Sequence, residues 1–217
     1  MGVDQYFLFL LRCDRISLML VTFILAINAA VFVLWNYSNA VSYEWMSEHF
    51  LVSWQALLDG RYYTLVSSVF SHNQFFHFLL NMLVLHSFGG IMLRTLGAFR
   101  FLSFYLIAGV ISSLSHALVS ALILEDASLP ALGASGALSG LILLFALIYP
   151  REKLLFFGII PMPALVGALL FMGLDVWGLM AQAGGGGLPI GHGAHLGGSF
   201  TGLIYFILFF KRRRYSF

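Results

Sequence analysis

The stretch GASGALSGLILLFALIY, residues 133–149, places a serine between small residues at the head of a long apolar run. The run contains no charged residue and ends at Pro150 and Arg151. Uncharged apolar runs of this kind predict a helix embedded in a membrane, here beginning near Ser135. Ser135 could be a packing residue or a nucleophile, and the rest of the sequence has to decide between these two interpretations.

The composition predicts an integral membrane protein. Of the 217 residues, 60% are hydrophobic and 9% are charged, whereas about 25% of the residues of a soluble domain are charged. No basic patch suggests a nucleic-acid partner, so the lipid bilayer is the expected environment. The single cysteine, Cys13, excludes an internal disulfide. We treat residues 1–217 as one membrane domain.

The uncharged apolar stretches predict an all-α, polytopic bundle of six transmembrane helices. The long segment 37–73, mixed polar and aromatic, is expected to form an extracytoplasmic first loop, and loops of this length usually carry structure or function. The six expected spans are about 16–36, 74–93, 101–124, 135–149, 154–174 and 194–210.

The basic residues gather on one side of this topology. Ten of the eleven Lys and Arg residues fall in the terminal segments and in alternate loops, and only Arg61 falls on the opposite side. The positive-inside rule then puts both termini in the cytoplasm. We expect a multi-pass protein of a bacterial inner membrane. The ten basic residues are Arg12, Arg15, Arg94, Arg100, Arg151, Lys153, Lys211, Arg212, Arg213 and Arg214.

Polar residues inside the expected spans lie at a common depth. Counted from the nearest basic boundary at 1.5 Å per residue, Ser135 and His195 both lie about 24 Å up. Asn81 lies at about 20 Å and His77 at about 26 Å. Polar groups are expensive in a membrane, so four of them in one layer from three helices indicate a functional site.

Ser135 and His195 have the chemistry of a nucleophile and its base. A helix N-terminus offers free N–H groups to a developing oxyanion, and a serine needs a base to remove its proton. Small residues beside each side chain should let the two helices approach closely. These small residues are Gly136 and Gly140 in one span, and Ala194, Gly198 and Gly202 in the other.

His77 and Asn81 are one turn apart on one helix face and can donate hydrogen bonds to a carbonyl oxygen that gains negative charge. The alternative is that they pair with each other or with the backbone. We assign His77, Asn81 and Gly133 to an oxyanion and substrate-binding side of the site.

Other candidate partners of His195 are weaker. Counted in the same way, Asp175 lies about 33 Å above Lys153, at the outer rim of the membrane. This is too high to orient His195 directly and leaves only a role through water, so we expect a Ser/His dyad rather than a triad. His192 lies about one turn closer to the surface. His116 sits in a serine-rich stretch, where a structural hydrogen bond is the expected role.

Three stretches together resemble the rhomboid family of intramembrane serine proteases. They are HNQFFHFLLN (72–81), GASGALSG (133–140) and AHLGGSFTG (194–202), on the second, fourth and sixth expected spans. The resemblance implies that Ser135 is the nucleophile and that His195 is the general base and then the general acid.

The resemblance also implies an oxyanion hole formed by His77, Asn81 and the backbone N–H of Ser135. The fifth span, with Phe156, Phe157, Phe171 and Trp177, would be the side on which a substrate helix enters. The chain departs from the family where many members carry an aromatic residue four positions after the nucleophile. Ser139 stands there, which leaves open what packs against His195.

The expected reaction is hydrolysis of peptide bonds in or next to transmembrane segments of membrane proteins, with no metal and no cofactor. An HExxH pair, as in metal-dependent membrane proteases, is absent from the sequence, and an aspartyl mechanism would need a second deep carboxylate. The alternative is a catalytically inactive rhomboid-like protein that binds membrane clients. A small transporter would more often show inverted repeats.

Overall fold

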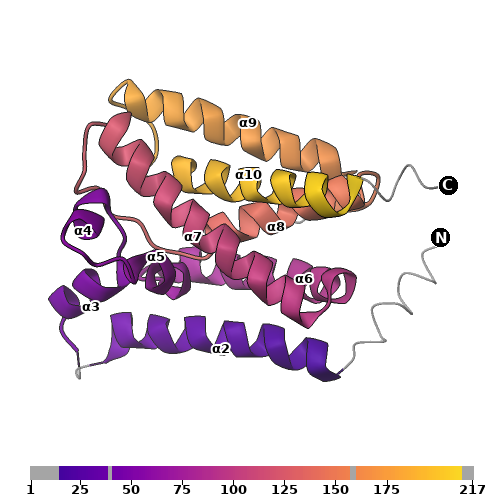
Figure 1. Cartoon of the computed structure of the whole chain (residues 1–217), viewed down its shortest axis with the longest axis horizontal. Helices are drawn as coiled ribbons and strands as arrows, with labels where there is room; N and C mark the ends of the chain where they lie inside the picture. Colours follow the sequence, from indigo (N-terminus) through magenta and orange to yellow (C-terminus); the bar gives the residue numbers. More distant parts are fainter. Residues whose placement is uncertain (1–14, 39–40, 157–159, 212–217) are drawn as a thin grey trace.

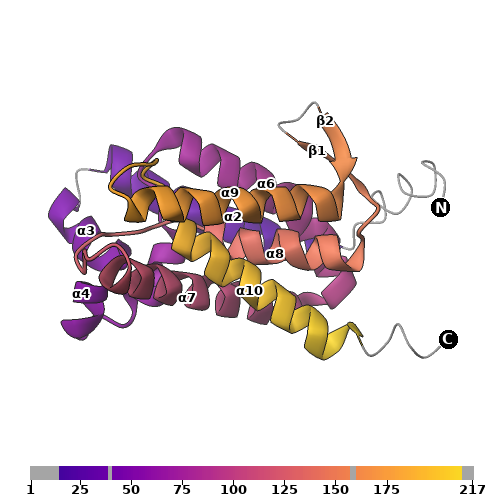
Figure 2. The same ribbon diagram turned by 90° about the horizontal axis from the view of Figure 1, so that it is seen from above.

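The long apolar runs of the sequence form helices that lie side by side in a bundle (Figures 1 and 2). The computed structural model describes residues 15–38, 41–156 and 160–211. The beginning of the first long helix and the end of the last lie at the same end of the bundle. The long helices are α2 (Arg15–Tyr37), α6 (Phe75–Leu96), α7 (Ala98–Leu122), α8 (Ser135–Ile148), α9 (Ala164–Ala183) and α10 (His192–Phe209).

Four helices of the described chain are long and apolar enough to cross a membrane. They contain the segments Met19–Tyr37, Phe75–Leu96, Ala98–Leu122 and Ala164–Ala183. Helix α8 is apolar but has only 14 residues, whereas a perpendicular span needs about 20. Four candidate spans therefore support a polytopic membrane protein. Helices α8 and α10 pack with these four helices in the same bundle.

The expected span 154–174 is wrong at its beginning. Residues Lys153–Phe156 (β1) and Ile160–Pro163 (β2) pair as an antiparallel hairpin, with Lys153 opposite Pro163, and α9 begins only at Ala164 (Figure 2). Proline lacks the N–H that a helix interior needs and disfavours helical geometry in the residue before it. Pro161 and Pro163 therefore delay the helix by ten residues relative to the prediction.

The segment expected as the first loop, 37–73, is built from short helices. These are α3 (Tyr43–Phe50), α4 (Trp54–Leu58), α5 (Thr64–Ser67) and the 3₁₀ turn η1 (Ser68–Phe70). Ser42 and Ser53 cap α3 and α4 by accepting hydrogen bonds from backbone N–H groups in the first turn. A bridge between Val52 and Ala131 ties this segment to the chain just before α8.

Helix α8 lies at the centre of the bundle, where α10 packs against it through glycines. A Cβ at Gly198 would collide with the carbonyl oxygen of Gly136, and one at Gly202 would collide with that of Gly140. This close approach brings the N-terminal ends of the two helices together. Most of α8 is buried, and its apolar side chains join the main core with α6, α7 and α9.

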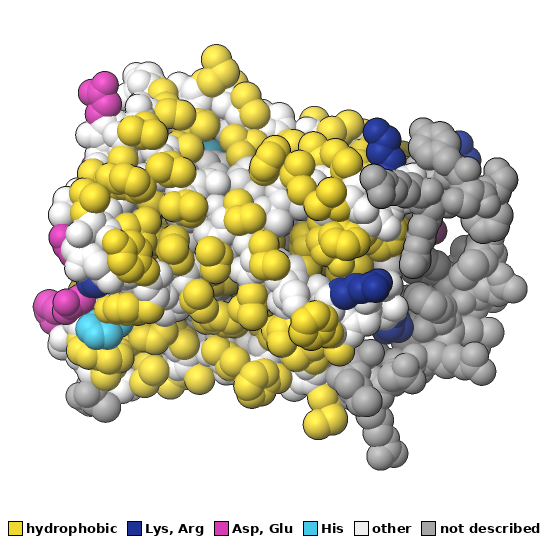
Figure 3. Space-filling model, viewed as in Figure 1, with side chains coloured by type: hydrophobic (Ala, Val, Ile, Leu, Met, Phe, Trp, Pro, Cys, Tyr) yellow, Lys and Arg dark blue, Asp and Glu magenta, His cyan; other side chains and the backbone are white. Residues whose placement is uncertain are grey.

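Charges divide between the two ends of the molecule (Figure 3). Arg94, Arg100, Arg151, Lys153 and Lys211 lie where α6, α8 and α10 end and where α7 begins, and dark blue side chains mark this end. Five acidic residues lie at the opposite end, around α3, α4 and the segment after α7: Glu44, Glu48, Asp59, Glu125 and Asp126. Arg61 pairs with Asp59 at that end, and Glu152 lies at the basic end between Arg151 and Lys153. The expected terminal charges Arg12 and 212–214 lie outside the described residues.

Candidate active site

Ser135 and His195 face each other from two different helices. Ser135 is the first residue of α8, and His195 lies in the first turn of α10. The Ser135 Oγ lies 2.9 Å from His195 Nε2, which is hydrogen-bonding distance. His195 is buried and Ser135 is half-buried. The serine hydroxyl can therefore donate its proton to this imidazole nitrogen.

The chain enters α8 through Gly133, whose φ of +116° is one that side chains with a Cβ rarely adopt. A Cβ there would also lie only 2.6 Å from Cε1 of His77. The Gly133 N–H donates to the Ser68 carbonyl at 2.8 Å, which fixes the segment before Ser135. Glycine is thus what lets His77 of α6 approach the beginning of α8.

His72, in the loop before α6, supports the same segment. The N–H of Ala134 donates to His72 Nε2 at 3.3 Å, so the proton of this imidazole belongs on Nδ1. Burial, helped by neighbouring His77, lowers the pKa of His72 to about 3. The imidazole therefore stays neutral at physiological pH and remains an acceptor for the residue next to Ser135.

Asn81, one turn after His77 on α6, is buried, and its Nδ2 donates to the His77 carbonyl at 2.7 Å. This is the backbone pairing that the sequence left open as an alternative for Asn81. An amide nitrogen carries two hydrogens, so the second remains for another acceptor. The first-turn N–H of Ser135 also points out of α8, because helix geometry gives it no partner four residues back. The oxyanion assignment of His77, Asn81 and Gly133 stays a prediction.

The expectation that Asp175 lies too high to orient His195 is wrong. Asp175 Oδ1 lies 2.9 Å from His195 Nδ1, and the aspartate is buried. The depth count assumed a helix from Lys153, but the hairpin occupies 153–163, so Asp175 lies only about 16 Å along α9 from Ala164. Ser135, His195 and the Asp175 carboxylate are therefore joined by two successive hydrogen bonds.

His192 shares this carboxylate. Its Nδ1 lies 2.8 Å from the same Asp175 Oδ1, and its ring packs against α9 where a Cβ at Gly178 would collide with it. His192 is the first residue of α10 and is buried. Two imidazoles therefore converge on one oxygen of Asp175 at the contact between α9 and α10.

An aromatic ring does pack against His195, and it comes from α9. The rings of Phe171 and His195 have centroids 5.7 Å apart and are tilted by 31°. Ser139, where many rhomboids carry an aromatic residue, instead donates its hydroxyl to the Ser135 carbonyl at 2.8 Å. Phe171 and Asp175 are four residues apart on one helix face, so α9 supplies both contacts. The spacing of four residues can be read from the sequence. The expected helix start at residue 154 was ten residues too early, however, and this placed Asp175 too far from His195.

Two other features lie apart from these contacts. His116 Nε2 pairs with the Leu129 carbonyl at 3.1 Å, which is the structural hydrogen bond that the sequence suggested.

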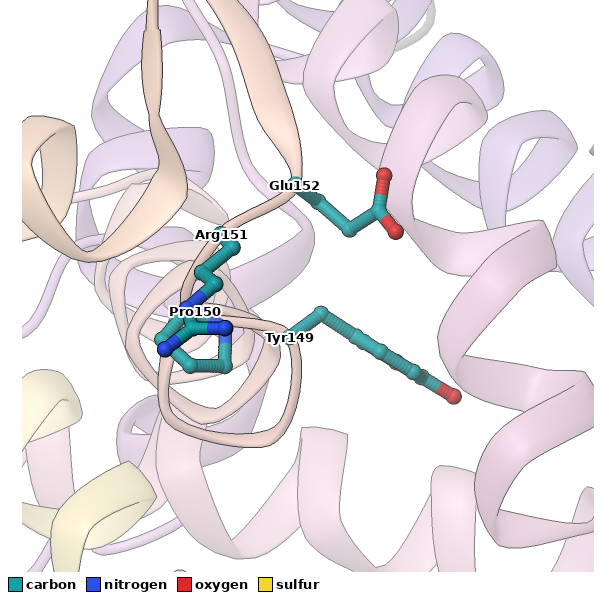
Figure 4. A pocket seen from close by; sticks show the side chains of 4 residues that line it. All are labelled: Tyr149, Pro150, Arg151 and Glu152. Atoms are coloured by element: carbon teal, nitrogen blue, oxygen red, sulfur yellow. The ribbon is translucent and has the colours of Figure 1, made fainter. Parts of the chain in front are cut away.

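A pocket lined by Tyr149, Pro150, Arg151 and Glu152 lies just beyond the C-terminal end of α8 (Figure 4). Since Ser135 begins the same helix, this pocket is about 20 Å away from it. Phe157, expected on the entry side, lies outside the described residues, and Phe156 belongs to the hairpin.

Several curated proteins resemble the chain over most of its length. "Rhomboid protein 1, mitochondrial" of Saccharomyces cerevisiae is 38% identical over 197 residues, which cover 86% of this chain and 52% of that protein. "RHOMBOID-like protein 12, mitochondrial" of Arabidopsis thaliana is 32% identical, covering 79% of this chain and 53% of that protein. "Presenilin-associated rhomboid-like protein A, mitochondrial" of Danio rerio is 31% identical, covering 85% and 46%. The chain therefore spans about half the length of these relatives.

These names contradict the expected location in a bacterial inner membrane with cytoplasmic termini. The relatives given above are mitochondrial proteins, and "Rhomboid-like protein 16, chloroplastic" of Arabidopsis thaliana is 31% identical over 162 residues. The positive-inside rule gives only the side on which basic residues stay, and it does not say which membrane the protein occupies. The bacterial assignment had no support beyond that rule and is wrong.

The family model described as "Rhomboid domain" matches residues 59–212. The match begins just after α4 and includes every long helix from α6 to α10, so it contains Ser135, Asp175 and His195. It covers more than half of the chain, and the relatives above agree with it. The chain therefore belongs to the rhomboid family.

Proposed function

We propose that the chain is an intramembrane serine protease that hydrolyses peptide bonds in or next to transmembrane segments of membrane proteins. The observation that carries the proposal is the contact of 2.9 Å between Ser135 Oγ and His195 Nε2. Family membership supports it, and so does the position of Ser135 at a helix N-terminus within a membrane bundle.

In the proposed reaction, His195 Nε2 accepts the proton of Ser135 as Oγ attacks the substrate carbonyl carbon. The C–N bond of the tetrahedral intermediate then breaks, and His195 gives the proton to the leaving amine. An acyl-enzyme remains on Ser135. Water, activated by the same nitrogen, releases the acid and restores the serine hydroxyl. These steps conserve all protons and need no redox group.

Hydrogen-bond donors are needed to stabilise the negatively charged oxygen of each tetrahedral intermediate. The Ser135 N–H is available in the first turn of α8, and His77 and the second amide hydrogen of Asn81 are the side-chain donors that we assign. Gly133 contributes by leaving room for the His77 ring beside this segment. We assign His77, Asn81 and Gly133 to substrate carbonyl binding on this basis.

Asp175 acts as a positioning residue in this proposal. Its carboxylate accepts the Nδ1–H of His195, so the Nε2 lone pair points at Ser135, and it stabilises the imidazolium that forms during attack. The sequence suggested a dyad, and we extend it to a serine, a histidine and an aspartate. Phe171 packs beside the imidazole and limits its rotation.

We place the protein in an organellar membrane of a eukaryotic cell, as the names of its mitochondrial and chloroplastic relatives suggest. Its substrates are then membrane proteins of the same bilayer. By the positive-inside rule, the basic end of the bundle faces the matrix or stroma. Ser135 begins α8 at the end away from these basic residues, so it lies nearer the opposite side of the membrane.

Cleavage of a membrane substrate tests the proposal. The purified chain and its Ser135→Ala variant are incubated in lipid with a single-span protein that carries small, helix-breaking residues near one membrane face. We expect cleavage by the wild type and none by Ser135→Ala, with unchanged helix content. Equal cleavage by the variant would exclude Ser135 as the nucleophile. No cleavage by a folded wild type would favour the inactive client-binding alternative.

A further inference from the structure

Two buried histidines and one buried aspartate converge where α9 meets α10. The Nδ1 atoms of His192 and His195 lie 2.8 and 2.9 Å from Asp175 Oδ1, and all three residues are buried. The potential ligand atoms of the three residues lie within 4.8 Å of one another. We propose that they form a binding site for a divalent transition-metal ion, with Zn²⁺ as the best match, and that the ion switches off Ser135.

The second oxygen of Asp175 supports a ligand here. Oδ2 is buried and has no hydrogen-bond partner in residues 15–38, 41–156 and 160–211. A buried carboxylate oxygen without a partner is unfavourable, because it has lost its water and gained nothing in return. A metal ion bound between the carboxylate and the two imidazoles would satisfy it.

The donor set selects the class of ion. Two imidazole nitrogens and one carboxylate oxygen suit Zn²⁺ and its d-block neighbours, whereas Mg²⁺ and Ca²⁺ prefer oxygen ligands. Zinc binds these atoms at about 2.0–2.2 Å, so its ligands need only small side-chain shifts from their present spacing. Water can fill the fourth position. The exposed segment 183–190 ends two residues before His192, so the cluster lies close to the surface of the bundle.

Metal binding and the proposed proteolysis exclude each other for a chemical reason. A neutral imidazole that binds a metal through Nδ1 carries its proton on Nε2. On binding, the His195 proton moves through water from Nδ1 to Nε2, and the total number of protons does not change. Nε2 then donates toward Ser135 Oγ and can no longer accept its proton. This regulatory part of the inference rests on the proposed protease function, whereas the binding part does not.

His192 distinguishes the metal site from the protease site. His192 Nδ1 hydrogen-bonds to Asp175, whereas the contact with Ser135 belongs to His195. His192→Gln removes a metal ligand and keeps a polar side chain next to Asp175. His86→Gln is the matched control, because His86 is exposed on α6, outside this cluster.

The first measurement is Zn²⁺ inhibition of cleavage of a single-span substrate by the EDTA-treated protein in detergent. Each variant is compared with its own metal-free rate. We expect Zn²⁺ to inhibit the wild type and His86→Gln reversibly and Mg²⁺ to have no effect. The inhibitory Zn²⁺ concentration should rise at least about tenfold in His192→Gln. Equal inhibition of all three proteins by Zn²⁺ would overturn the proposal.

The second measurement does not depend on activity. Co²⁺ replaces Zn²⁺ in such sites, and in four-coordinate geometry it absorbs visible light far more strongly than aqueous Co²⁺ does. We expect this absorption in the wild type, and its loss in His192→Gln and in His192→Phe, which retains a ring. No such absorption in the wild type, or equal absorption in the folded variants, would overturn the site. If metal-free wild type binds Co²⁺ but cleaves nothing, the site stands and both the protease proposal and its metal switch fail.

Discussion

Asp175 decides which nitrogen of His195 carries the proton. With the Nδ1–H donated to the carboxylate at 2.9 Å, the lone pair of Nε2 faces Ser135 Oγ, also at 2.9 Å. Without a charged acceptor, the ring could carry its proton on Nε2 and present a donor to the serine. The carboxylate also stabilises the imidazolium that the proposed reaction forms.

Replacing Asp175 by Asn should therefore slow turnover more than it weakens substrate binding. We expect Asp175→Asn to lower kcat by about 10²-fold or more, with little change in KM, since the amide keeps the shape and loses the charge. Steady-state cleavage of a model substrate in lipid measures both constants. Phe23→Leu, at an exposed position of α2, is the control and should leave both constants nearly unchanged. A kcat that survives Asp175→Asn would leave a simple dyad.

His72 should make stability depend on pH. Its pKa is about 3 in the folded protein and about 6.5 in the unfolded chain, so below pH 6.5 the unfolded chain binds a proton that the folded protein does not. The free energy of unfolding should fall as the pH drops through this window, by up to about 1.4 kcal/mol per pH unit from this residue. Unfolding in mixed micelles between about pH 7 and about pH 4.5 should show a shallower decline for His72→Gln. Parallel curves for the two proteins would contradict the assigned role.

At the level of single residues, the sequence predicted the site residues that lie in a recognisable local pattern. Ser135 at a helix start and His195 beside a small-residue stripe could be paired by depth, because each lies on a helix whose basic end was correctly placed. Asp175 was rejected because its depth was counted across the hairpin. Pro161 and Pro163 were the available signal that the helix begins later.

At the scale of elements, the contact between α8 and α10 determines the distance from Ser135 to His195. The two backbones touch where Gly136 faces Gly198 and where Gly140 faces Gly202. Sequence alone predicted this smooth interface, because small residues recur every four positions on both helices. It could not predict that α9 supplies an aromatic ring and a carboxylate to the same histidine, since that depends on how α9 is rotated against α10.

Adding one methyl group at this interface should destabilise the fold. We expect Gly198→Ala to lower the free energy of unfolding by about 1–3 kcal/mol, because its Cβ would meet the Gly136 carbonyl. It should also reduce labelling of Ser135 by a serine-directed probe, since the helices must separate. Gly173→Ala on α9 is the control: nothing lies within 4 Å of its Cβ, and alanine favours helix by about 1 kcal/mol. Equal stabilities of the two variants would contradict the proposed packing.

At the scale of the whole molecule, the division of charge sets how the bundle sits in a bilayer. Most of the basic residues in the described chain lie at one end (Figure 3). Most of the acidic residues lie at the other end, with Arg61 among them and Glu152 as an exception. Ser135 begins α8, whose other end carries Arg151 and Lys153. Sequence predicted this polarity well, because charge position along the chain is enough to find it. The expected bacterial membrane is wrong, because the distribution of basic residues gives a side of the membrane and not the kind of membrane.

Labelling from one side of the membrane checks this orientation. In a Cys13→Ser background, Glu125→Cys and Arg151→Cys put single thiols at opposite ends of the bundle. A membrane-impermeant maleimide added to sealed vesicles should modify only one of the two, and detergent should expose the other. The positive-inside rule predicts that the residue-151 thiol reacts from the matrix or stromal side. Modification of both thiols from one side would refute the arrangement.

Chemical modification of Ser135 measures whether His195 activates it as a nucleophile. The protein in lipid is treated with a fluorophosphonate, and the modified residue is identified by mass spectrometry. We expect a single adduct on Ser135 in the wild type, and a rate of modification that falls by at least about 10²-fold in His195→Ala. No adduct on Ser135 in the folded, metal-free protein, or an adduct that forms equally fast without His195, would contradict the proposed mechanism.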